Sequence, residues 1–273
     1  MQLVVIGTGL IGGSFALAAR QQRLFDRIVG VDPDGERRRR ALDLGVIEAV
    51  VESVPEDAGA VLLAGPSHTI APWVVRLADH PGIVFDTGSV KSAVLADIRA
   101  AGPLPPRFVP CHPLAGSEQS GPDAADGTLF RNAEVIVTPA AETDMAAVRK
   151  VREWWRAVGA TVVEMAADEH DRVLALTSHL PHLVAFSYLQ LIDDEHRRHT
   201  AGGFRDFTRI GASDPRMWSP ILRLNRDAVL AALDDLEGEL QRARTLMEQS
   251  DETGMLEFLQ NAVRRRNGHR HGR

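Results

Sequence analysis

The fold is decided by the opening stretch Val4-Val5-Ile6-Gly7-Thr8-Gly9-Leu10-Ile11-Gly12. This stretch sets a G-x-G-x-x-G pattern between an apolar run and a segment whose apolar residues have helical spacing. In such a unit the first glycine permits a tight turn, the second lets backbone amides approach a pyrophosphate, and the third lets helix and strand pack closely. We therefore expect a dinucleotide to bind at the start of the helix, at Gly7, Thr8, Gly9, Leu10, Ile11 and Gly12.

An acidic residue completes this unit. Asp32 closes the next apolar run about 20 residues further on, where a carboxylate accepts hydrogen bonds from the adenosine ribose and repels a 2′-phosphate. The cofactor is therefore expected to be NAD rather than NADP. Arg37 is near enough in sequence to reach a 2′-phosphate, but Pro33-Asp34-Gly35-Glu36 predicts a turn and a helix start that point it outward.

Two domains follow from the apolar pattern. Up to residue 165, short apolar runs alternate with amphipathic segments, which predicts a Rossmann-type α/β domain with a mostly parallel sheet. The predicted strands are 3–6, 28–31, 60–64, 83–86, 108–110, 135–138 and 161–164. From Ala166 onward apolar residues recur at helical spacing only. We expect a dinucleotide-binding domain at 1–165 and an all-α substrate and dimerisation domain at 166–273.

The composition narrows the partners. The helical part has more apolar residues than short helices bury alone, which favours a homodimer, and its basic run from about residue 264 predicts a disordered tail. A formal net charge of −6 argues against a broad nucleic-acid surface. With Cys111 as the single cysteine and no apolar run long enough for a bilayer, we expect a cytoplasmic protein with a small-molecule substrate and no membrane partner.

Polar residues gather in four clusters, at residues 86–92, 111–118, 178–182 and 204–210. The first two follow predicted strands, where open parallel sheets bind ligands. In this order, with Glu169-His170-Asp171 and Ser213-Asp214-Pro215-Arg216-Met217-Trp218, they resemble the prephenate dehydrogenase family, which includes cyclohexadienyl and arogenate dehydrogenases. The resemblance runs from residue 4 to about residue 225. It implies oxidative decarboxylation of prephenate to 4-hydroxyphenylpyruvate in tyrosine biosynthesis, with NAD taking the hydride.

Two residues are expected to carry the chemistry. Removing hydride from a carbon that bears a hydroxyl needs an acceptor for the hydroxyl proton, and the neutral imidazole of His112 suits this task. We expect His112 on a loop just beyond a strand end, fixed by Pro113 and Gly116. Ser89 is either the N-cap of a helix at 90–98 or, as the resemblance implies, a residue beside the nicotinamide that bonds the histidine or the substrate.

Prephenate carries two carboxylates, so the site needs local cations. Arg209 matches the family's substrate-binding arginine, and Arg205 is either a second cation or an ion-pair partner of Asp206. The other expected substrate-binding residues are His182, Ser117, Ser178, Trp218 and Gly202.

Each of these has a local reason. Pro181 cannot donate to the carbonyl of Thr177, so a kink there is expected to aim Ser178, His179 and His182 into the cleft. Ser117 and Glu118 resemble family positions at the mouth of the site. Trp218 resembles the family's substrate-side tryptophan, although a buried tryptophan that packs helices is the default. The Gly202-Gly203 turn corresponds to a family loop that enters the partner subunit's site.

The remaining histidines and the cysteine stay open. His179 is either a hydrogen-bonded core residue or functional, and His170 is likewise unassigned. The i, i+3 spacing of His179 and His182 could suggest a metal, but no cysteine or carboxylate cluster completes a ligand set, so no metal is expected. Cys111 is expected in the core.

Three alternatives remain. A β-hydroxyacid dehydrogenase would use a lysine of the helical part, but the only lysines are Lys91 and Lys150. A non-catalytic NAD-binding sensor would not need His112, Ser89 and Arg209 together. Arogenate has an amine where prephenate has a ketone, and no unambiguous carboxylate is present to recognise it, so prephenate is favoured.

Overall fold

The computed structural model describes residues 1–116 and 119–268. The chain forms two compact units, Met1–Arg226 and Asp227–Arg273. The first unit contains both β-sheets and the helices up to α10. The described residues of the second unit form α11, apart from its first residue, and α12, with a short turn between them.

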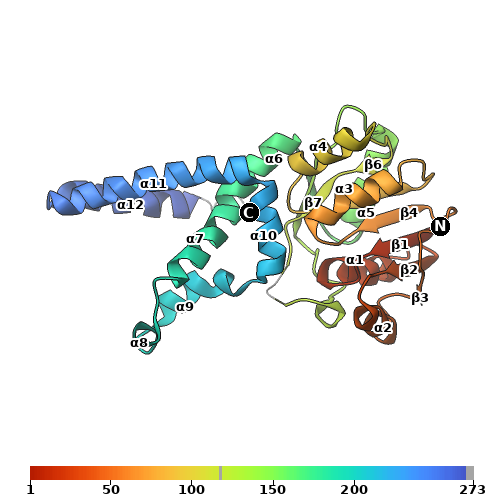
Figure 1. Ribbon diagram of the computed structural model, residues 1–273, viewed down its shortest axis with the longest axis horizontal. Coiled ribbons are helices and arrows are strands. Elements are labelled where there is room, and N and C mark those ends of the chain that lie inside the picture. The colour runs from red at the N-terminus through yellow and green to blue at the C-terminus, as the bar shows by residue number, and fades with distance from the viewer. Residues whose placement is uncertain (117–118, 269–273) are drawn as a thin grey trace. The chain divides into compact units, whose positions relative to one another are not determined.

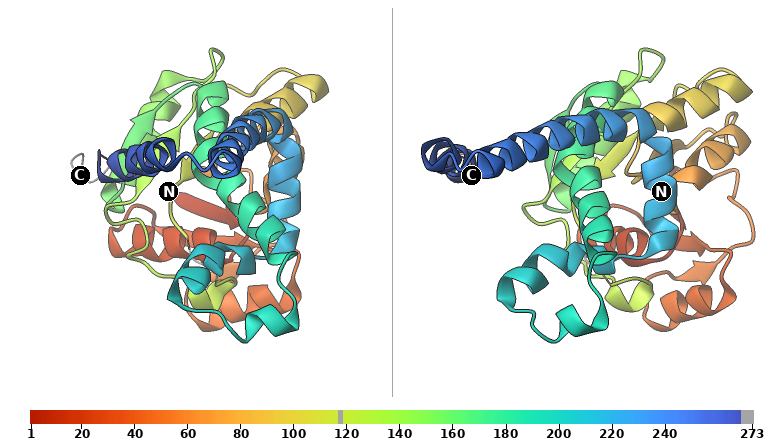
Figure 2. Two further views of the ribbon diagram at one scale, coloured as in Figure 1. Left: turned by 90° about the vertical axis from the view of Figure 1, so that its left-hand side faces the viewer. Right: turned by 60° about the vertical axis from the view of Figure 1, so that its left-hand side comes forward.

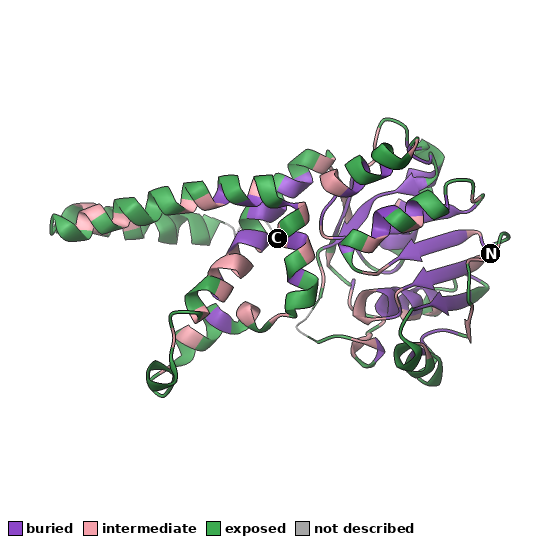
Figure 3. Cartoon of the chain, viewed as in Figure 1, coloured by how far each residue is buried: buried purple, intermediate pink, exposed green. Residues whose placement is uncertain are grey.

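The first unit is built around a six-stranded parallel sheet with the order β3-β2-β1-β4-β5-β6 (Figure 1). Because helices cover both faces of such a sheet, its strands are apolar along their length, and β4 and β5 are buried at every residue (Figure 3). The order reverses between β1 and β4, and the carboxyl ends of strands at such a point are where ligands bind. The strands are β1 (Gln2–Ile6), β2 (Arg27–Val31), β3 (Ala49–Val50), β4 (Ala60–Leu63), β5 (Ile83–Asp86) and β6 (Phe108–Val109).

Helices pack on both faces of this sheet. One face carries an apolar core shared with α1 and α5, in which the Phe15 ring centre lies 5.4 Å from that of Phe85 and 4.8 Å from that of Trp155. The other face packs against α3 and α4. The helices of this layer are α1 (Leu10–Gln21), α2 (Gly35–Asp43), α3 (Ser67–Arg76), α4 (Ser92–Ala101) and α5 (Met145–Ala157).

A second sheet follows, with the order β7-β8-β9. Its strands are β7 (Cys111–Pro113), β8 (Glu134–Val137) and β9 (Thr161–Glu164), and a short 3₁₀ turn lies at Pro122–Ala124. β7 runs antiparallel to β8, with His112 opposite Ile136. The expectation that His112 lies on a loop is therefore wrong. Pro110 has no N–H for the parallel ladder, so β6 ends before it and the chain resumes pairing with β8.

The predicted strands are all present to within one residue at either end, whereas the two- and three-residue strands β3 and β7 were not predicted. After β9 the described chain has helices and turns only, which confirms the expected fold class.

The helical part of the first unit contains α6 (Ala167–Leu174), α7 (Leu180–Leu189), α8 (Asp194–Arg197), α9 (Gly202–Thr208) and α10 (Pro215–Leu224). α7 packs on α9, and two further views of this part are given in Figure 2. The irregularity expected at Pro181 takes the form of a π turn at Ala175–His179, with Pro181 in the first turn of α7. Gly202 and Gly203 start α9 instead of forming a separate turn, and a 3₁₀ turn at Arg209–Ala212 follows.

The second unit holds the long helices α11 (Arg226–Glu248) and α12 (Glu252–Gly268), where the Arg242 guanidinium lies 5.6 Å from the centre of the Phe258 ring. α12 continues to Gly268, so residues 264–268 of the expected tail are helical, and the rest of the basic run lies outside the described residues. Within the described ranges, none of the helices combines the length and apolar character needed to cross a bilayer.

Candidate active site

The glycine loop has the shape that a pyrophosphate requires. Gly7 has a φ of +92°, and a Cβ there would lie 2.8 Å from the Ala64 backbone. A Cβ on Gly12 would lie 2.1 Å from the Gly7 carbonyl oxygen, so neither position accepts a side chain. Gly9 instead faces open space, and no side chain caps α1 there. The first amides of α1 are therefore available to phosphate oxygens.

The Asp32 carboxylate lies beside this loop, at the end of β2, and is 1% exposed. Its Oδ2 accepts hydrogen bonds from the Thr8 amide at 2.9 Å and the Thr8 hydroxyl at 3.3 Å, and its Oδ1 accepts one from the Asp34 amide. The Arg37 guanidinium lies 3.7 Å from Oδ1. Arg37 therefore turns back toward Asp32, and the expectation that it points outward is wrong.

His112 is the first member of a chain of hydrogen bonds. Its Nδ1 lies 2.8 Å from Nε2 of His170, and Nδ1 of His170 lies 2.8 Å from Oδ1 of Asp171. An ionised carboxylate only accepts, so the Asp171 contact places the His170 proton on Nδ1 and leaves His170 Nε2 as an acceptor. His112 must then donate from Nδ1. The lone pair of its Nε2 remains to take a proton.

Burial keeps these groups in the required states. Desolvation is the main cause that lowers the pKa of His112 well below 6.5, and electrostatic interactions with His170, Lys91 and His179 disfavour its protonation further. Desolvation also lowers the pKa of His170, against the opposing effect of the hydrogen bond that His170 donates to Asp171. Burial would raise the pKa of Asp171, but hydrogen bonds from His170 and from two backbone amides outweigh it, so this pKa is lowered. Both imidazoles are therefore neutral and the carboxylate is ionised near pH 7.

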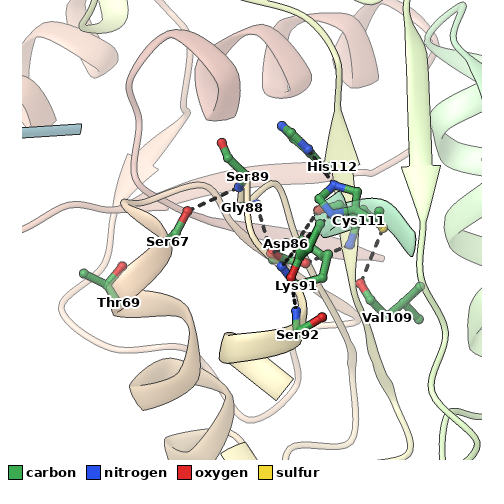
Figure 4. A network of polar contacts seen from close by, with 12 residues as sticks. Ser67, Thr69, Asp86, Gly88, Ser89, Lys91, Ser92, Val109, Cys111 and His112 are labelled. Carbon is green, nitrogen blue, oxygen red and sulfur yellow. Dashed lines mark hydrogen bonds and ion pairs between the residues drawn. The ribbon is translucent and has the colours of Figure 1, made fainter. Parts of the chain in front are cut away.

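Asp171 also caps helix α4. Its Oδ1 accepts the Lys91 amide at 2.9 Å and its Oδ2 accepts the Ser92 amide at 2.8 Å. Ser89 is consequently not the N-cap. Its amide donates to Ser67 Oγ at 3.2 Å (Figure 4), and among the described residues no hydrogen bond joins its hydroxyl to His112.

A buried ion pair lies behind the His112 strand. Lys91 Nζ is 2.5 Å from Asp86 Oδ2 and 2.6 Å from the Cys111 carbonyl oxygen, and the side chains of both charged residues are at most 1% exposed. Asp86 Oδ1 in turn accepts the Cys111 amide at 2.8 Å, so both backbone groups of Cys111 are held (Figure 4). Burial raises the pKa of the Cys111 thiol, as expected for a core cysteine.

The helical segment brings a second group of residues together. Asn225 Nδ2 donates to the Asp171 carbonyl oxygen and lies 2.9 Å from Nδ1 of His179, whose pKa is lowered to about 4, mainly by burial. His182 Nδ1 donates to the Ser178 carbonyl oxygen, and its ring stacks on Trp218 with 3.6 Å between centres. His179 is thus linked to the backbone of Asp171, while His182 is half-buried against Trp218.

The arginines of this segment, Arg205 and Arg209, are exposed. The positive charge of Arg209 adds to desolvation in lowering the pKa of His182, so the guanidinium lies near enough to act on this imidazole. Gly202 and Arg205 lie on exposed turns of α9. Ser117 falls outside the described residues. Within the described ranges no group of three or more histidine, cysteine or carboxylate side chains is placed to hold a metal ion.

Sequence reasoning missed three contributors to this site: Asp171, Lys91 and Asn225. The available signal was the Glu169-His170-Asp171 motif, in which a histidine and a carboxylate are adjacent at the start of a helix.

The comparisons with known proteins agree with this geometry. A family model described as prephenate dehydrogenase, nucleotide-binding domain, matches residues 15–164, and one described as prephenate dehydrogenase, dimerization domain, matches residues 166–261. The chain belongs to the prephenate dehydrogenase family. The expected family, fold class, NAD cofactor and oxidoreductase class are thereby confirmed.

Individual relatives cover nearly the whole chain. A prephenate dehydrogenase of Bacillus subtilis is 36% identical in an alignment of 282 positions that covers 97% of this chain and 75% of the relative. The solved prephenate dehydrogenase of A. aeolicus has a TM-score of 0.92 and 33% identity, with 98% of each chain covered. The solved arogenate dehydrogenase of Synechocystis has a TM-score of 0.82 and 26% identity and covers 98% of this chain and 100% of its own.

Proposed function

We propose that this prephenate dehydrogenase family member oxidises and decarboxylates prephenate to 4-hydroxyphenylpyruvate, with His112 as the general base. The observation that carries the proposal is the hydrogen-bond chain His112–His170–Asp171, which leaves Nε2 of His112 as the basic nitrogen. NAD, when bound, accepts the hydride. The solved A. aeolicus relative, a complex with hydroxyphenyl propionate and NAD⁺, supports a ring-bearing acid as the substrate class.

The residues of this chain then have separate tasks. Nε2 of His112 takes the proton of the substrate hydroxyl as the ring carbon becomes a carbonyl. The new imidazolium donates from Nδ1 to His170, and the Asp171 carboxylate stabilises the positive charge. Loss of carbon dioxide follows because it makes the ring aromatic, so no acid is assigned to that step.

Binding is divided between two groups of residues. We assign the cofactor to the loop residues and the carboxylate of β2, namely Gly7, Thr8, Gly9, Leu10, Ile11, Gly12 and Asp32. We assign the substrate carboxylates to Arg209, with its neighbour His182, since a guanidinium binds a carboxylate in a bidentate way. Ser89, Ser117, Ser178, Trp218 and Gly202 complete the proposed site.

The proposed assembly is a cytoplasmic homodimer with a dinucleotide-binding domain at 1–165 and a substrate and dimerisation domain at 166–273. Two observations support the dimer. The second family model is described as a dimerization domain, and α11 and α12 expose large apolar side chains, including Leu240, Met247, Leu256 and Leu259. The single buried cysteine fits a reducing compartment.

Arogenate is the second candidate substrate, because an arogenate dehydrogenase is among the structural relatives. The test is the initial rate of NADH formation with NAD and either prephenate or arogenate, with a 3-hydroxy acid as the control substrate. Prephenate is expected to give the higher kcat/KM and the control substrate none. A higher kcat/KM with arogenate would replace the proposed substrate, and tight NAD binding with no turnover of any substrate would favour a sensor.

A further inference from the structure

The chain buries one of its two lysines. Lys91 is 1% exposed, although a buried ammonium group is costly unless it is fully paired. Its Nζ has two acceptors, the Asp86 carboxylate at 2.5 Å and the Cys111 carbonyl oxygen at 2.6 Å. The second acceptor belongs to the residue that directly precedes His112. An apolar side chain would fill this place at a lower cost, so the charge itself calls for a reason.

Lys91 also reaches His112 by a second route. Its backbone amide donates to Asp171 Oδ1, the same oxygen that accepts the hydrogen bond from His170 Nδ1–H, and His170 accepts from His112. Lys91 is therefore connected to His112 in two ways. Its amide reaches the His112 side chain through Asp171 and His170. Its ammonium group reaches the His112 backbone through the adjacent residue, Cys111.

We propose that Lys91 is a positioning residue for His112, because its amide orients the hydrogen-bond chain to the imidazole while its ammonium group clamps the strand that carries it. This inference rests on the proposed role of His112 as the base. Lys91 is enclosed and its ammonium group already bonds two acceptors, so it is not placed to bind substrate. Figure 4 shows Asp86, Lys91 and Cys111 close together, while the hydrogen bond between Ser89 and Ser67 lies apart from this cluster.

The positive charge of Lys91 also favours the neutral, proton-accepting form of His112. The His112 imidazole bonds His170 of α6 and interacts electrostatically with His170, Lys91 and His179 of the π turn. Two carboxylates lie one contact further away, Asp171 on His170 and Asp86 on Lys91. After desolvation and His170, the positive charge of Lys91 is the next cause that lowers the pKa of His112. A fixed cation nearby disfavours a second proton on the imidazole, so Nε2 stays available as an acceptor.

The test compares two single variants, each of which removes one positive charge. Lys91→Met removes the buried ammonium group, and Lys150→Met removes the only other lysine, which is exposed and paired with Glu153 on α5. The pKa and tautomer of His112 are read without substrate, by NMR of ¹⁵N-histidine-labelled protein, with His112→Asn used to assign the signal. The acid limb of kcat/KM for prephenate is measured in parallel.

Lys91→Met is expected to move the His112 titration and the acid limb of kcat/KM to higher pH, and to lower kcat while the KM for NAD stays unchanged. Lys150→Met is expected to change none of these. Because Lys91→Met leaves Asp86 unpaired, the double variant Asp86→Asn/Lys91→Met is made as well. In this double variant the His112 titration is also expected to move to higher pH, but by less than in Lys91→Met.

Folded Lys91 variants with a wild-type His112 titration and tautomer would overturn the proposal. Failure of both Lys91→Met and Asp86→Asn/Lys91→Met to fold would also overturn it, because a role confined to the stability of the fold would then explain why Lys91 is buried. Since the NMR titration needs no substrate, it decides the role of Lys91 even if prephenate proves to be the wrong substrate.

Discussion

Nδ1 of His112 lies 2.8 Å from Nε2 of His170, a residue 58 positions further along the chain. His170 is in turn bonded to Asp171, the carboxylate that caps α4. One carboxylate therefore fixes the start of a helix beside the cofactor sheet and the tautomer of the proposed base. Substitution of Asp171 is therefore expected to lower catalysis through His170 and His112, although Asp171 itself is not placed against substrate or NAD.

Asp171→Asn tests this dual role. The asparagine keeps the shape of the side chain but replaces one acceptor oxygen with a donor, which disturbs the proton order along His170 and His112. We expect kcat to fall by about 100-fold or more, because the carboxylate holds the histidines in the required tautomer, with the KM for NAD unchanged. Asp144→Asn is the matched control, because Asp144 caps α5 through the Ala146 amide and should leave kcat unchanged. A wild-type kcat for Asp171→Asn would remove Asp171 from the mechanism.

Asp32→Asn tests the choice of cofactor. Removing the carboxylate charge weakens the bonds to the adenosine ribose, and hydrogen bonds to charged groups contribute about 1.5–3 kcal/mol, so the KM for NAD should rise roughly 10- to 100-fold. The change also frees Arg37, which lies 3.7 Å from the carboxylate, to meet a 2′-phosphate. The ratio of kcat/KM with NADP to that with NAD should therefore increase, and adding Arg37→Ala should reverse the gain. An unchanged ratio would contradict the placement of the ribose.

Arg209→Ala tests the substrate cation. Loss of a guanidinium–carboxylate contact is expected to raise the KM for prephenate on the order of 10- to 100-fold, with NAD affinity retained. Arg205→Ala is the matched control, since Arg205 lies on an exposed turn of α9, where charges contribute little. Steady-state kinetics with each substrate varied separates the two effects. An Arg209→Ala effect confined to NAD would refute the assignment.

Acid should destabilise the fold through its buried histidines. The pKa values of His112, His170 and His179 are lowered in the folded protein, to about 4 for His179, from about 6.5 in the unfolded chain. The unfolded chain therefore binds more protons as the pH falls below 6.5. The stability that these histidines contribute is complete above pH 6.5 and is lost as the pH falls toward the folded values.

Urea unfolding at pH 7.5 and 5.5 measures this loss. Each buried histidine should lower the free energy of unfolding by up to about 1.4 kcal/mol per pH unit below 6.5. His179→Gln, which keeps a polar side chain beside Asn225, should show a shallower decline than the parent protein. Equal stability at the two pH values would mean that the histidines are not buried in the neutral form.

The sequence predicts what is encoded locally. The glycine loop, its helix and Asp32 form one unit of about 30 residues, and each longer strand has its own apolar run. β7 escaped prediction because its three residues, which follow Pro110 and end on Pro113, are too few to show an alternating pattern. The sequence therefore predicted the strand that ends at Pro110 but not the next one, β7, which carries His112.

The support of His112 depends on contacts between distant segments. Asp171 meets the Lys91 amide across 80 positions, and no local pattern shows that a lysine side chain will turn into the core. The chemistry of His112 could be predicted from the residue type and the resemblance, whereas its tautomer and its anchoring required the fold.

The most direct test of the account is the initial rate of NADH formation from prephenate at saturating NAD, for the parent protein and His112→Asn. We predict that the variant binds NAD with the parent affinity and loses turnover by about 100-fold or more, because no other group takes the hydroxyl proton. Equal turnover by the two proteins would contradict the assignment of His112 as the base.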